Sequence, residues 1–328
     1  MKGLYWIISG ALTLAGIGMM GAGGAILRNN QAKGENLSGE VKAQVEKFDI
    51  QVRNSDLQFI GDDSAKTLTY TIENAPKSIK VKEEGGVFSI QDEERRTQFF
   101  HFMTEDQTKT KILVVYPSGW EASDTNIELG SGDGRIENLT TDTLSMKLGS
   151  GSLEVKDSSA SGKFDIQSGS GEMSLSNSDF GDTVVEEGSG QMTFVGCDFQ
   201  SLAYDCGSGD LILDGVKVAK DFQFEAGSGH IKGGNLTVNG ESSIEVASGE
   251  FDVDAFTPGG KTGFTFGSGD IQCSLTGKQE DYSFNCAEIG SGEVTIGNTR
   301  AERIVTNQGD KLVTISGGSG SIDIGFLQ

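Results

Sequence analysis

Apolar and polar residues alternate along the chain around a short motif that recurs at a nearly constant interval. The dipeptide Ser-Gly marks this motif at ten serines, nine of which also follow a glycine: Ser131, Ser150, Ser170, Ser189, Ser208, Ser228, Ser248, Ser268, Ser291 and Ser319. Successive serines lie 19 or 20 residues apart as far as Ser268, and the last two intervals are 23 and 28 residues. A period of this length indicates a stack of repeated structural units.

The residues on both sides of these serines alternate as they do in β-strands. Apolar residues stand three and five positions after the serine, as at Leu153 and Val155, and four and two positions before it, as at Ile244 and Val246. A period of two predicts strands that bury one face, and glycine permits the tight corner between them. Each repeat is therefore predicted to contain two or three short strands joined by a Gly-Ser-Gly corner.

A single repeat cannot bury its apolar face, so the repeats are expected to stack on one another. Equivalent strands would then pair in parallel, about 4.8 Å apart, around one continuous core. The predicted fold class is all-β, a parallel β-solenoid (β-helix) of about 20-residue coils over residues 119–328, preceded by one N-terminal transmembrane helix. Residues 45–118 alternate without the Ser-Gly marker and are expected to form an N-terminal β cap.

Residues 1–28 form the predicted membrane anchor. Residues 4–27 include no charged side chain, and as a helix they are long enough to cross a hydrocarbon core. The large apolar side chains of this segment are Leu4, Trp6, Ile7, Ile8, Leu12, Leu14, Ile17, Ile26 and Leu27. A cleaved signal peptide is the alternative, because Gly23 and Ala25 suit a cleavage site, although the apolar run is longer than usual. Residues 29–44 would be a linker to an extracytoplasmic β-domain.

The charge of the chain limits its partners. Asp and Glu number 48 and Lys and Arg number 26, which gives a net charge of −22 and argues against nucleic-acid binding. Four acidic residues stand three positions before the serine in consecutive repeats, and we call them the acidic column: Glu186, Asp205, Glu225 and Glu245. They are a candidate face for cations or cationic peptides. The alternative is a solvated face that keeps the protein soluble.

One aromatic segment interrupts the alternation. Its apolar residues, Phe99, Phe100, Phe102 and Met103, cannot all be buried on one strand face. They are a candidate loop for a membrane surface or a protein partner, for which the nearby Arg95 and Arg96 are suited. The alternative is a plug that seals the open end of the core.

The four cysteines allow two interpretations. Cys206 and Cys273 occupy inward strand positions, which favours small buried side chains. Disulfides between Cys197 and Cys206 and between Cys273 and Cys286 are the alternative in an exported protein.

No catalytic, cofactor-binding or metal-binding residue is predicted. His101 and His230 are far apart in the sequence and lack the spacing of a metal site or a catalytic triad. Gly-Ser-Gly-Asp resembles calcium-binding glycine-rich repeats only superficially, because its period is too long and the aspartate is replaced in many copies. The sequence therefore predicts a protein that is not an enzyme and needs no cofactor.

The repeats resemble those of a bacterial putative-adhesin family, a domain of unknown function with β-strand repeats. The resemblance rests on residues 112–119 (ILVVYPSG) leading into residues 129–133 (LGSGD), on the repeated Gly-Ser-Gly unit, and on the closing residues 318–324 (GSGSIDI). It implies a non-enzymatic, adhesin-like structural or binding module of the cell envelope, anchored in the cell membrane by its N-terminal helix. Its partners would be an envelope protein, a cell-surface ligand or a cationic peptide.

Two other functions remain open from the sequence. One is an envelope-stress accessory that senses a ligand or binds a membrane partner. The other, more remote, is a carbohydrate-active enzyme, because the separation of a carboxylate pair in space is not readable from sequence.

Overall fold

The computed structural model describes residues 34–93, 109–301, 304–305 and 309–327. The chain divides into two compact units, residues 1–33 and residues 34–328, and all described residues belong to the second. The predicted membrane anchor therefore lies outside the described residues. Within them, the only helix is the 3₁₀-helix η1 (Gln279–Asp281), and no helix is long and apolar enough to cross a membrane.

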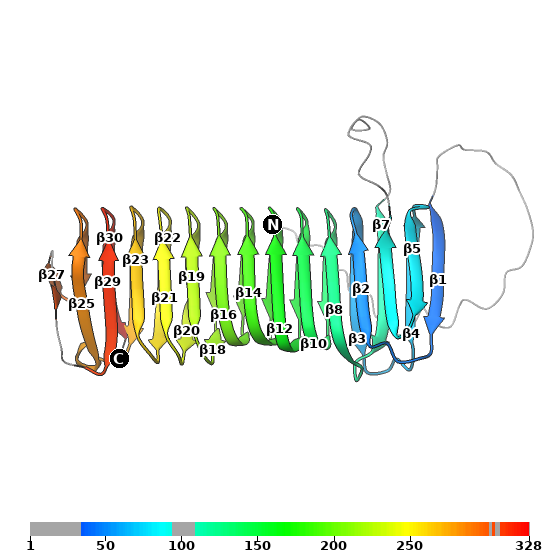
Figure 1. Ribbon diagram of the computed structural model, residues 1–328, viewed down its shortest axis with the longest axis horizontal. Coiled ribbons are helices and arrows are strands. Elements are labelled where there is room, and N and C mark those ends of the chain that lie inside the picture. The colour runs from blue at the N-terminus through cyan, green and yellow to red at the C-terminus, as the bar shows by residue number, and fades with distance from the viewer. Residues whose placement is uncertain (1–33, 94–108, 302–303, 306–308, 328) are drawn as a thin grey trace, which may run out of the picture. The chain divides into compact units, whose positions relative to one another are not determined.

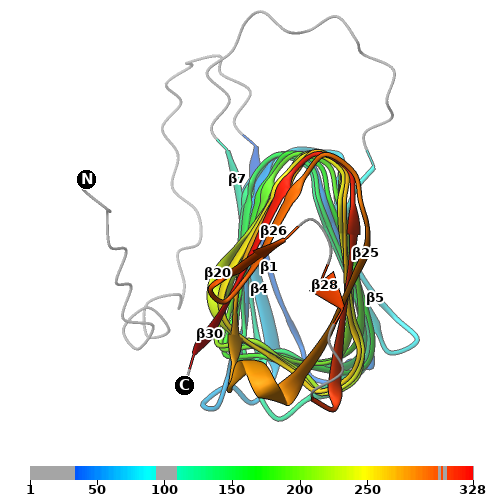
Figure 2. The same cartoon turned by 90° about the vertical axis from the view of Figure 1, so that its left-hand side faces the viewer.

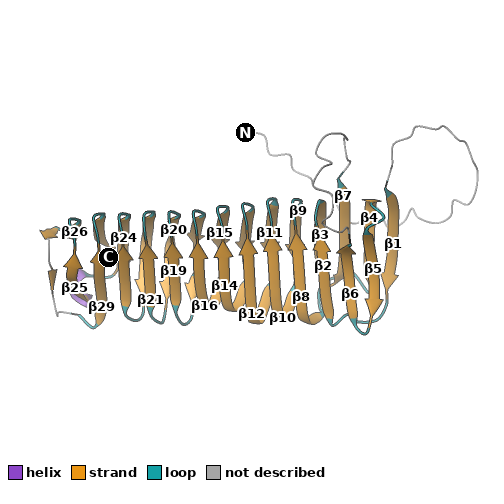
Figure 3. Cartoon of the chain, turned by 45° about the horizontal axis from the view of Figure 1, so that its top comes forward, coloured by secondary structure: helices purple, strands orange, loops and turns teal. Residues whose placement is uncertain are grey.

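The described residues form one sheet of 30 strands (Figures 1 and 3). The N-terminal part contains β1 (Glu35–Val41), β2 (Lys47–Val52), β3 (Ser55–Asp62), β4 (Leu68–Ala75), β5 (Ile79–Glu84), β6 (Val87–Asp92) and β7 (Thr110–Pro117). The central part contains β8 (Glu121–Leu129), β9 (Asp133–Glu137), β10 (Thr140–Leu148), β11 (Ser152–Lys156), β12 (Ser159–Ser168), β13 (Glu172–Ser176), β14 (Asp179–Glu187), β15 (Gln191–Val195), β16 (Asp198–Cys206), β17 (Asp210–Asp214), β18 (Lys217–Val218), β19 (Phe222–Ala226), β20 (His230–Val238), β21 (Ser242–Val246), β22 (Glu250–Pro258), β23 (Thr262–Phe266) and β24 (Asp270–Thr276). The C-terminal part contains β25 (Tyr282–Ile289), β26 (Glu293–Ile296), β27 (Thr299–Ala301), β28 (Ile304–Val305), β29 (Lys311–Gly317) and β30 (Ser321–Leu327).

Except for the two-residue β18, which pairs with β16 and β20, the central strands lie in two rows that the Gly-Ser-Gly corners connect. Row A consists of β8, β10, β12, β14, β16, β19, β21 and β23, and each pairs in parallel with the next. Row B consists of β9, β11, β13, β15, β17, β20, β22 and β24, paired in the same way. The predicted parallel pairing of equivalent strands, one repeat apart, is observed in both rows.

The fold class of a parallel β-solenoid is nevertheless wrong for the whole domain. The sheet wraps around one core in a nearly closed ring (Figure 2). It is a mixed sheet rather than a parallel one, because it includes the antiparallel pairs β1–β4, β4–β7, β5–β6, β25–β28 and β26–β27. The reason is clear at β5–β6, where only Gly85 and Gly86, with φ of 61° and 79°, connect the strands. A two-residue connection can join only antiparallel strands, and positive φ at both positions suits a tight hairpin.

The order of strands in space also departs from the order in sequence at both ends. At the C-terminal end, β29 and β30 pair directly with β23 and β24, and β25 and β26 pair on the far side of them. At the N-terminal end, β2 lies between β6 and β8, and β3 lies between β7 and β9. At the C-terminal end the chain therefore passes over one level and returns to fill it with β29 and β30. At the N-terminal end it forms the level of β2 and β3 first and later passes over this level from β7 to β8.

The core is a continuous column of apolar side chains from alternate strand positions. Met146, Ile166, Val185, Tyr204 and Phe224 succeed one another along row A, and each is at most 1% exposed. Aromatic rings contact one another between levels, as Tyr204 and Phe224 do with ring centroids 5.6 Å apart. This burial supplies the main stabilisation, because a fully buried large apolar side chain contributes about 1.5–3 kcal/mol.

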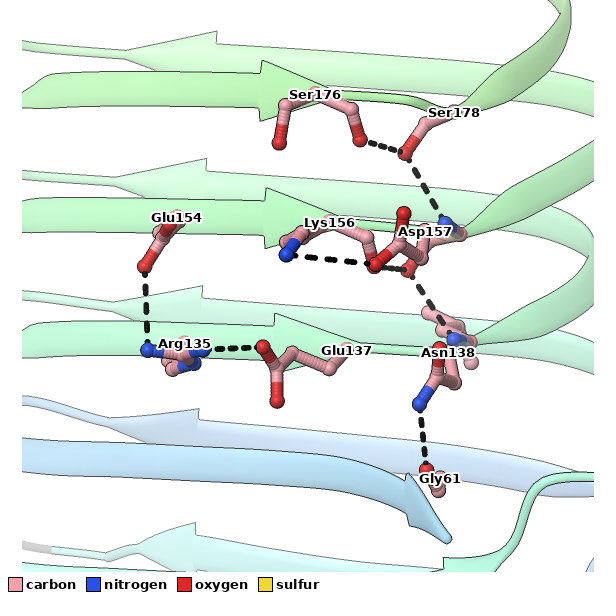
Figure 4. Close-up of polar contacts among 11 residues, drawn as sticks. Gly61, Arg135, Glu137, Asn138, Glu154, Lys156, Asp157, Ser176 and Ser178 are labelled. Carbon is pink, nitrogen blue, oxygen red and sulfur yellow. Dashed lines mark hydrogen bonds and ion pairs between the residues drawn. The ribbon is translucent and has the colours of Figure 1, made fainter. Parts of the chain in front are cut away.

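A second corner, which the Ser-Gly period does not predict, follows β9, β11, β13, β15 and β17 and lies within β20 and β22. A residue with positive φ recurs there at intervals of 19 or 20 residues: Asn138, Asp157, Asn177, Gly196, Gly215, Asn235 and Ala255. Figure 4 shows this corner, where Asn138 Nδ2 donates to the carbonyl of Gly61 at 2.8 Å and Ser178 Oγ donates to the carbonyl of Ser176 at 2.8 Å. Glycine, Asn and Asp tolerate this backbone conformation better than other residues, so the corner depends on them.

Candidate cation-binding face

The acidic column forms a continuous ladder on the outer surface of row A. Each residue of the column pairs in register with the next one: Glu186 on β14, Asp205 on β16, Glu225 on β19 and Glu245 on β21. All four side chains are exposed. The structure thus brings together all four residues of this candidate site. Their direction follows from alternation, because the residues before and after each of them face the core.

The column carries charge that the described residues do not neutralise. None of its four carboxylates forms an ion pair with a described basic side chain. Glu186 accepts a hydrogen bond from Gln167 Nε2 at 3.3 Å. Two like charges about 4.8 Å apart repel by about 0.9 kcal/mol in water. A cation placed along the column would relieve this repulsion.

A groove of about 630 Å³ runs beside the first half of this ladder. It crosses β8, β10, β12, β14 and β16 at the ends that lead into the Gly-Ser-Gly corners, and the outward side chains along it are Glu128, Lys147, Gln167, Glu186 and Asp205. The first glycines of the corners line it too, among them Gly149 and Gly169, and present backbone rather than side chains. Three carboxylates and one lysine therefore face a shallow channel that runs across the strands.

Glu187, the residue after Glu186, faces the opposite way and is only 5% exposed. Its carboxylate accepts a hydrogen bond from the hydroxyl of Tyr204. Burial raises the pKa of Glu187, the nearby Asp210 raises it further, and the hydrogen bond from Tyr204 acts in the opposite direction. Sequence reasoning missed this residue, although a signal existed: Glu187 is acidic at an inward position, two residues before the serine, where most repeats carry an apolar residue.

The other sequence-predicted site residues are not placed by the structure. Phe99, Phe100, Phe102 and Met103 lie outside the described residues, as do the apolar side chains of the predicted anchor. Both alternatives for the aromatic segment, partner loop or plug, therefore stay predictions, as do both alternatives for residues 1–28, membrane anchor or signal peptide. Within the described part of the chain, no group of three or more His, Cys, Asp or Glu residues has a geometry that could hold a metal ion.

The cysteines are buried, and the predicted alternative of two disulfides is wrong. Cys197, Cys206 and Cys273 are free thiols, so neither Cys197–Cys206 nor Cys273–Cys286 is bonded. Cys197 directly precedes β16 and Cys206 ends it, so the length of an extended strand separates these two residues, and both thiols are buried in the apolar core instead. Burial raises the pKa of Cys197 to about 11 and that of Cys206 to about 12, and the carboxylates near both thiols add to the effect.

These thiols are expected to be unreactive in the folded protein. The thiolate is the reactive form, and burial both suppresses it and blocks access, so labelling of Cys206 should be slower than that of an exposed cysteine by about a hundredfold or more. A colorimetric thiol reagent added to native protein should release almost no chromophore. The same reagent should titrate all four cysteines after unfolding in guanidinium chloride. Rapid labelling of a native thiol would contradict the buried register of these strands.

Comparison with known proteins identifies the family. The family model described as Toastrack DUF4097 matches residues 45–233 and 162–325, which together span most of the chain. The chain belongs to the Toastrack DUF4097 family. The resemblance to a bacterial β-repeat family of unknown function is thereby confirmed.

Solved structures with similarity to this Toastrack protein are distant. A "putative lipid binding protein" from Parabacteroides distasonis is 18% identical with a TM-score of 0.44, and covers 88% of this chain and 97% of its own. A "putative adhesin" from the same organism is 14% identical with a TM-score of 0.41 and the same coverage. Both are too distant to support an argument about the function of this chain. No curated protein matches the chain.

Proposed function

We propose that this Toastrack protein is a non-enzymatic binding module of the bacterial cell envelope, and that the acidic column and its groove bind cationic ligands, above all basic peptides. The observation that carries the proposal is the register of Glu186, Asp205, Glu225 and Glu245, which places four carboxylates in a row with no described basic partner. A regular row of charge suits an extended polycation, because each level of the sheet offers one carboxylate to a neighbouring positive group.

The location of the module is part of the same proposal. The uncharged residues 4–27 would hold the chain in the cell membrane, with the β-domain on the extracytoplasmic side. An acidic, regular surface in that place would meet cationic peptides or basic segments of envelope proteins and cell-surface ligands. A rigid scaffold of buried strands supports such a surface without any chemistry of its own.

Binding of oligolysine to the full-length chain tests this function. In the variant with Glu186→Gln, Asp205→Asn, Glu225→Gln and Glu245→Gln, we expect affinity at low salt to fall about tenfold, equivalent to about 1.4 kcal/mol shared over four exposed charges. Isothermal titration calorimetry at low and high salt measures the change. The wild type should lose affinity as salt rises, and the variant should depend on salt less steeply.

A control variant separates the column from the overall charge. It removes four exposed carboxylates outside the column: Glu84→Gln, Glu172→Gln, Glu241→Gln and Asp323→Asn. Both variants have the same net charge, so only the position of the lost charges differs. Equal weakening in both variants, or no weakening in either, would remove the acidic column as the binding face.

A further inference from the structure

The two rows of the sheet end at different levels at the N-terminal end. Beyond β8, row A continues through β2 and β6 and ends with β5. Beyond β9, row B continues through β3, β7 and β4 and ends with β1. Row B is therefore one strand longer, and β1 lies beyond β4 and β5 at this end of the sheet (Figure 1). We call this end, formed by β1 and β5, the step.

Both strands of the step have an edge without a partner strand among the described residues. In this part of the chain, β1, with seven residues, pairs only with β4, and β5, with six residues, pairs only with β6. An edge strand offers its backbone N–H and C=O groups to a further strand. The other end of the sheet is better protected, because its rows end with β27 and β28, antiparallel strands of only three and two residues. Strand addition is therefore expected at the step.

The apolar core is also incompletely covered at the step. Leu37 on β1, Tyr70 on β4 and Val81 on β5 pack against the core but are only partly buried. Phe48 on β2, two strands further in than β5, is 2% exposed. Burial of apolar surface is the main favourable term in most protein–protein association. A strand that pairs with each edge would therefore also cover these side chains.

The charges of the two edges favour the pairing of β1 with β5 from a second copy of the chain. The charged residues of β1 are both acidic, Glu35 and Glu40, and both are exposed. β5 carries two exposed lysines, Lys80 and Lys82, before its acidic end at residues 83–84. Opposite charges on neighbouring strands stabilise a sheet, and like charges destabilise it. Pairing of β1 with a second β1 would bring acidic residues together without a basic one.

Strand directions decide how two copies can meet at the step. β1 runs in the direction of row B, because two antiparallel pairs, β1–β4 and β4–β7, separate it from the parallel strands. β5 is antiparallel to β6 and so runs against row A. The two rows themselves run in opposite directions around the core, because short corners connect them. β1 and β5 therefore point in the same direction.

A two-fold axis along the strands makes the step complementary to itself. Rotation about this axis keeps the strand direction and exchanges rows A and B of the second copy. β1 of each copy then lies next to β5 of the other and parallel to it, at the level where row A of the other copy has no strand. We propose that this chain forms a two-fold dimer through the step, with two parallel β1–β5 pairs that join the two sheets into one. An interface of this kind is closed, so association stops at two copies.

The position of the N-terminal segments fits this arrangement. Residues 1–33 come before β1 in the chain, and both β1 strands begin on the same side of the dimer. Both segments can then enter one membrane, a step that rests on the membrane anchoring included in the proposed function. Antiparallel pairing of β1 with a second β1 would place the two beginnings on opposite sides.

Chemical cross-linking of the full-length chain in detergent micelles tests which strands pair. Ser38 on β1 and Lys80 on β5 are exposed, and within one copy they belong to opposite rows. The proposed dimer brings Ser38 of each copy close to Lys80 of the other. The variant with both Ser38→Cys and Lys80→Cys should therefore give a covalent dimer with a short bismaleimide on a denaturing gel. The wild type, whose own thiols are buried, should stay monomeric on the gel.

The two single variants are the matched controls. In the proposed dimer, the two copies of Ser38 lie on opposite faces, as do the two copies of Lys80, so neither single variant should cross-link. A covalent dimer of Ser38→Cys alone would show that β1 pairs with β1 and would overturn the proposal. Absence of a covalent dimer in the double variant would overturn it as well.

Reversal of the charges gives a second test that needs no cross-linker. Lys80→Glu with Lys82→Glu should raise the Kd of the dimer about tenfold or more, because repulsion from β1 replaces attraction. Glu35→Lys with Glu40→Lys should do the same, and all four substitutions together should restore most of the affinity. The ion pair that Lys82 forms with Glu93 at 3.4 Å is exposed, so its loss should change stability little. Sedimentation equilibrium in detergent micelles measures Kd, and equal values for all variants, or no restoration in the fourfold variant, would contradict the pairing.

The dimer and the cationic site can fail independently. The acidic column lies on β14, β16, β19 and β21, away from the step. The edge variants should therefore keep the affinity of each chain for oligolysine, and the variant that neutralises the column should keep the dimer. Loss of the dimer on neutralisation of the column would show that the column, rather than the step, holds the copies together.

Discussion

Replacement of Val185 by Asp is expected to lower the free energy of unfolding by about 4 kcal/mol, among the largest effects of any single substitution in this protein. Val185 is fully buried on β14 between Ile166 and Tyr204 in the adjacent strands. A carboxylate there would lose its hydration without gaining a cation. A change of this size corresponds to a fall of about 10 °C in Tm for a domain of this length.

Val184 provides a control of the same residue type one position away. Its side chain is 38% exposed, so Val184→Asp should change Tm by no more than about 1–2 °C. Far-UV circular dichroism during heating measures both variants. The pair tests the register of row A directly, because a slip of one residue would exchange the two valines between core and solvent. Similar melting temperatures for the two variants would show that the register is wrong.

Gly151→Ala is expected to destabilise the fold by about 3 kcal/mol, although it adds only one methyl group. Gly151 ends a Gly-Ser-Gly corner, and a Cβ at this position would overlap the carbonyl oxygen of Gly132 in the preceding repeat. That carbonyl belongs to the backbone and accepts a hydrogen bond from the N–H of Ser152, so it cannot move aside without loss of pairing between the levels.

Gly119→Ala is the matched control for this effect. A Cβ at Gly119 would meet no atom within 4 Å, and its φ is not in the positive range. The substitution should therefore leave stability unchanged or raise it slightly, because alanine has less freedom in the unfolded chain. Urea unfolding of both variants checks the difference. If Gly151→Ala were tolerated as well as Gly119→Ala, close stacking would not explain the recurrence of glycine at these corners.

The centre of the fold could be predicted because one period controls it. The intervals between Ser131 and Ser268 set the pairing of rows A and B, and alternation then separates core residues such as Phe194 from surface residues such as Glu225. The acidic column could be predicted from the same spacing between repeats. Its four residues share one offset from the serine, so a parallel register places them side by side.

The ends of the sheet could not be predicted from that period. Spacing shows that Ser291 and Ser319 each mark the corner of a level. It does not show that the level of Ser319 lies next to that of Ser268, as the hydrogen bond from Ser319 N–H to the carbonyl of Gly267 places it. The order of levels depends on connections that pass over one another, and these leave no periodic signal. The antiparallel pair β5–β6 did leave a local signal in the sequence, because Gly85-Gly86 between two apolar runs is typical of a hairpin.

Two features of the site were visible only as exceptions to the pattern. Ser168 and Glu187 are polar at inward positions on consecutive levels, where the alternation predicts apolar residues. An average over repeats removes such exceptions, so the period alone does not reveal these two residues. The second corner was missed for a different reason. Its residues share a backbone conformation rather than a residue type, and Asn138, Gly196 and Ala255 do not look alike in sequence.

The parallel register of the rows makes length an adjustable property of this molecule. A strand such as β12 or β14 pairs only with the equivalent strands before and after it, so deletion or duplication of one whole repeat there would join partners that already fit each other. Unequal recombination at the gene level could therefore change the number of repeats while both ends stay the same. Every repeat gained or lost within the acidic column would also add or remove one exposed carboxylate, so the length of the sheet and the charge on its surface would change together.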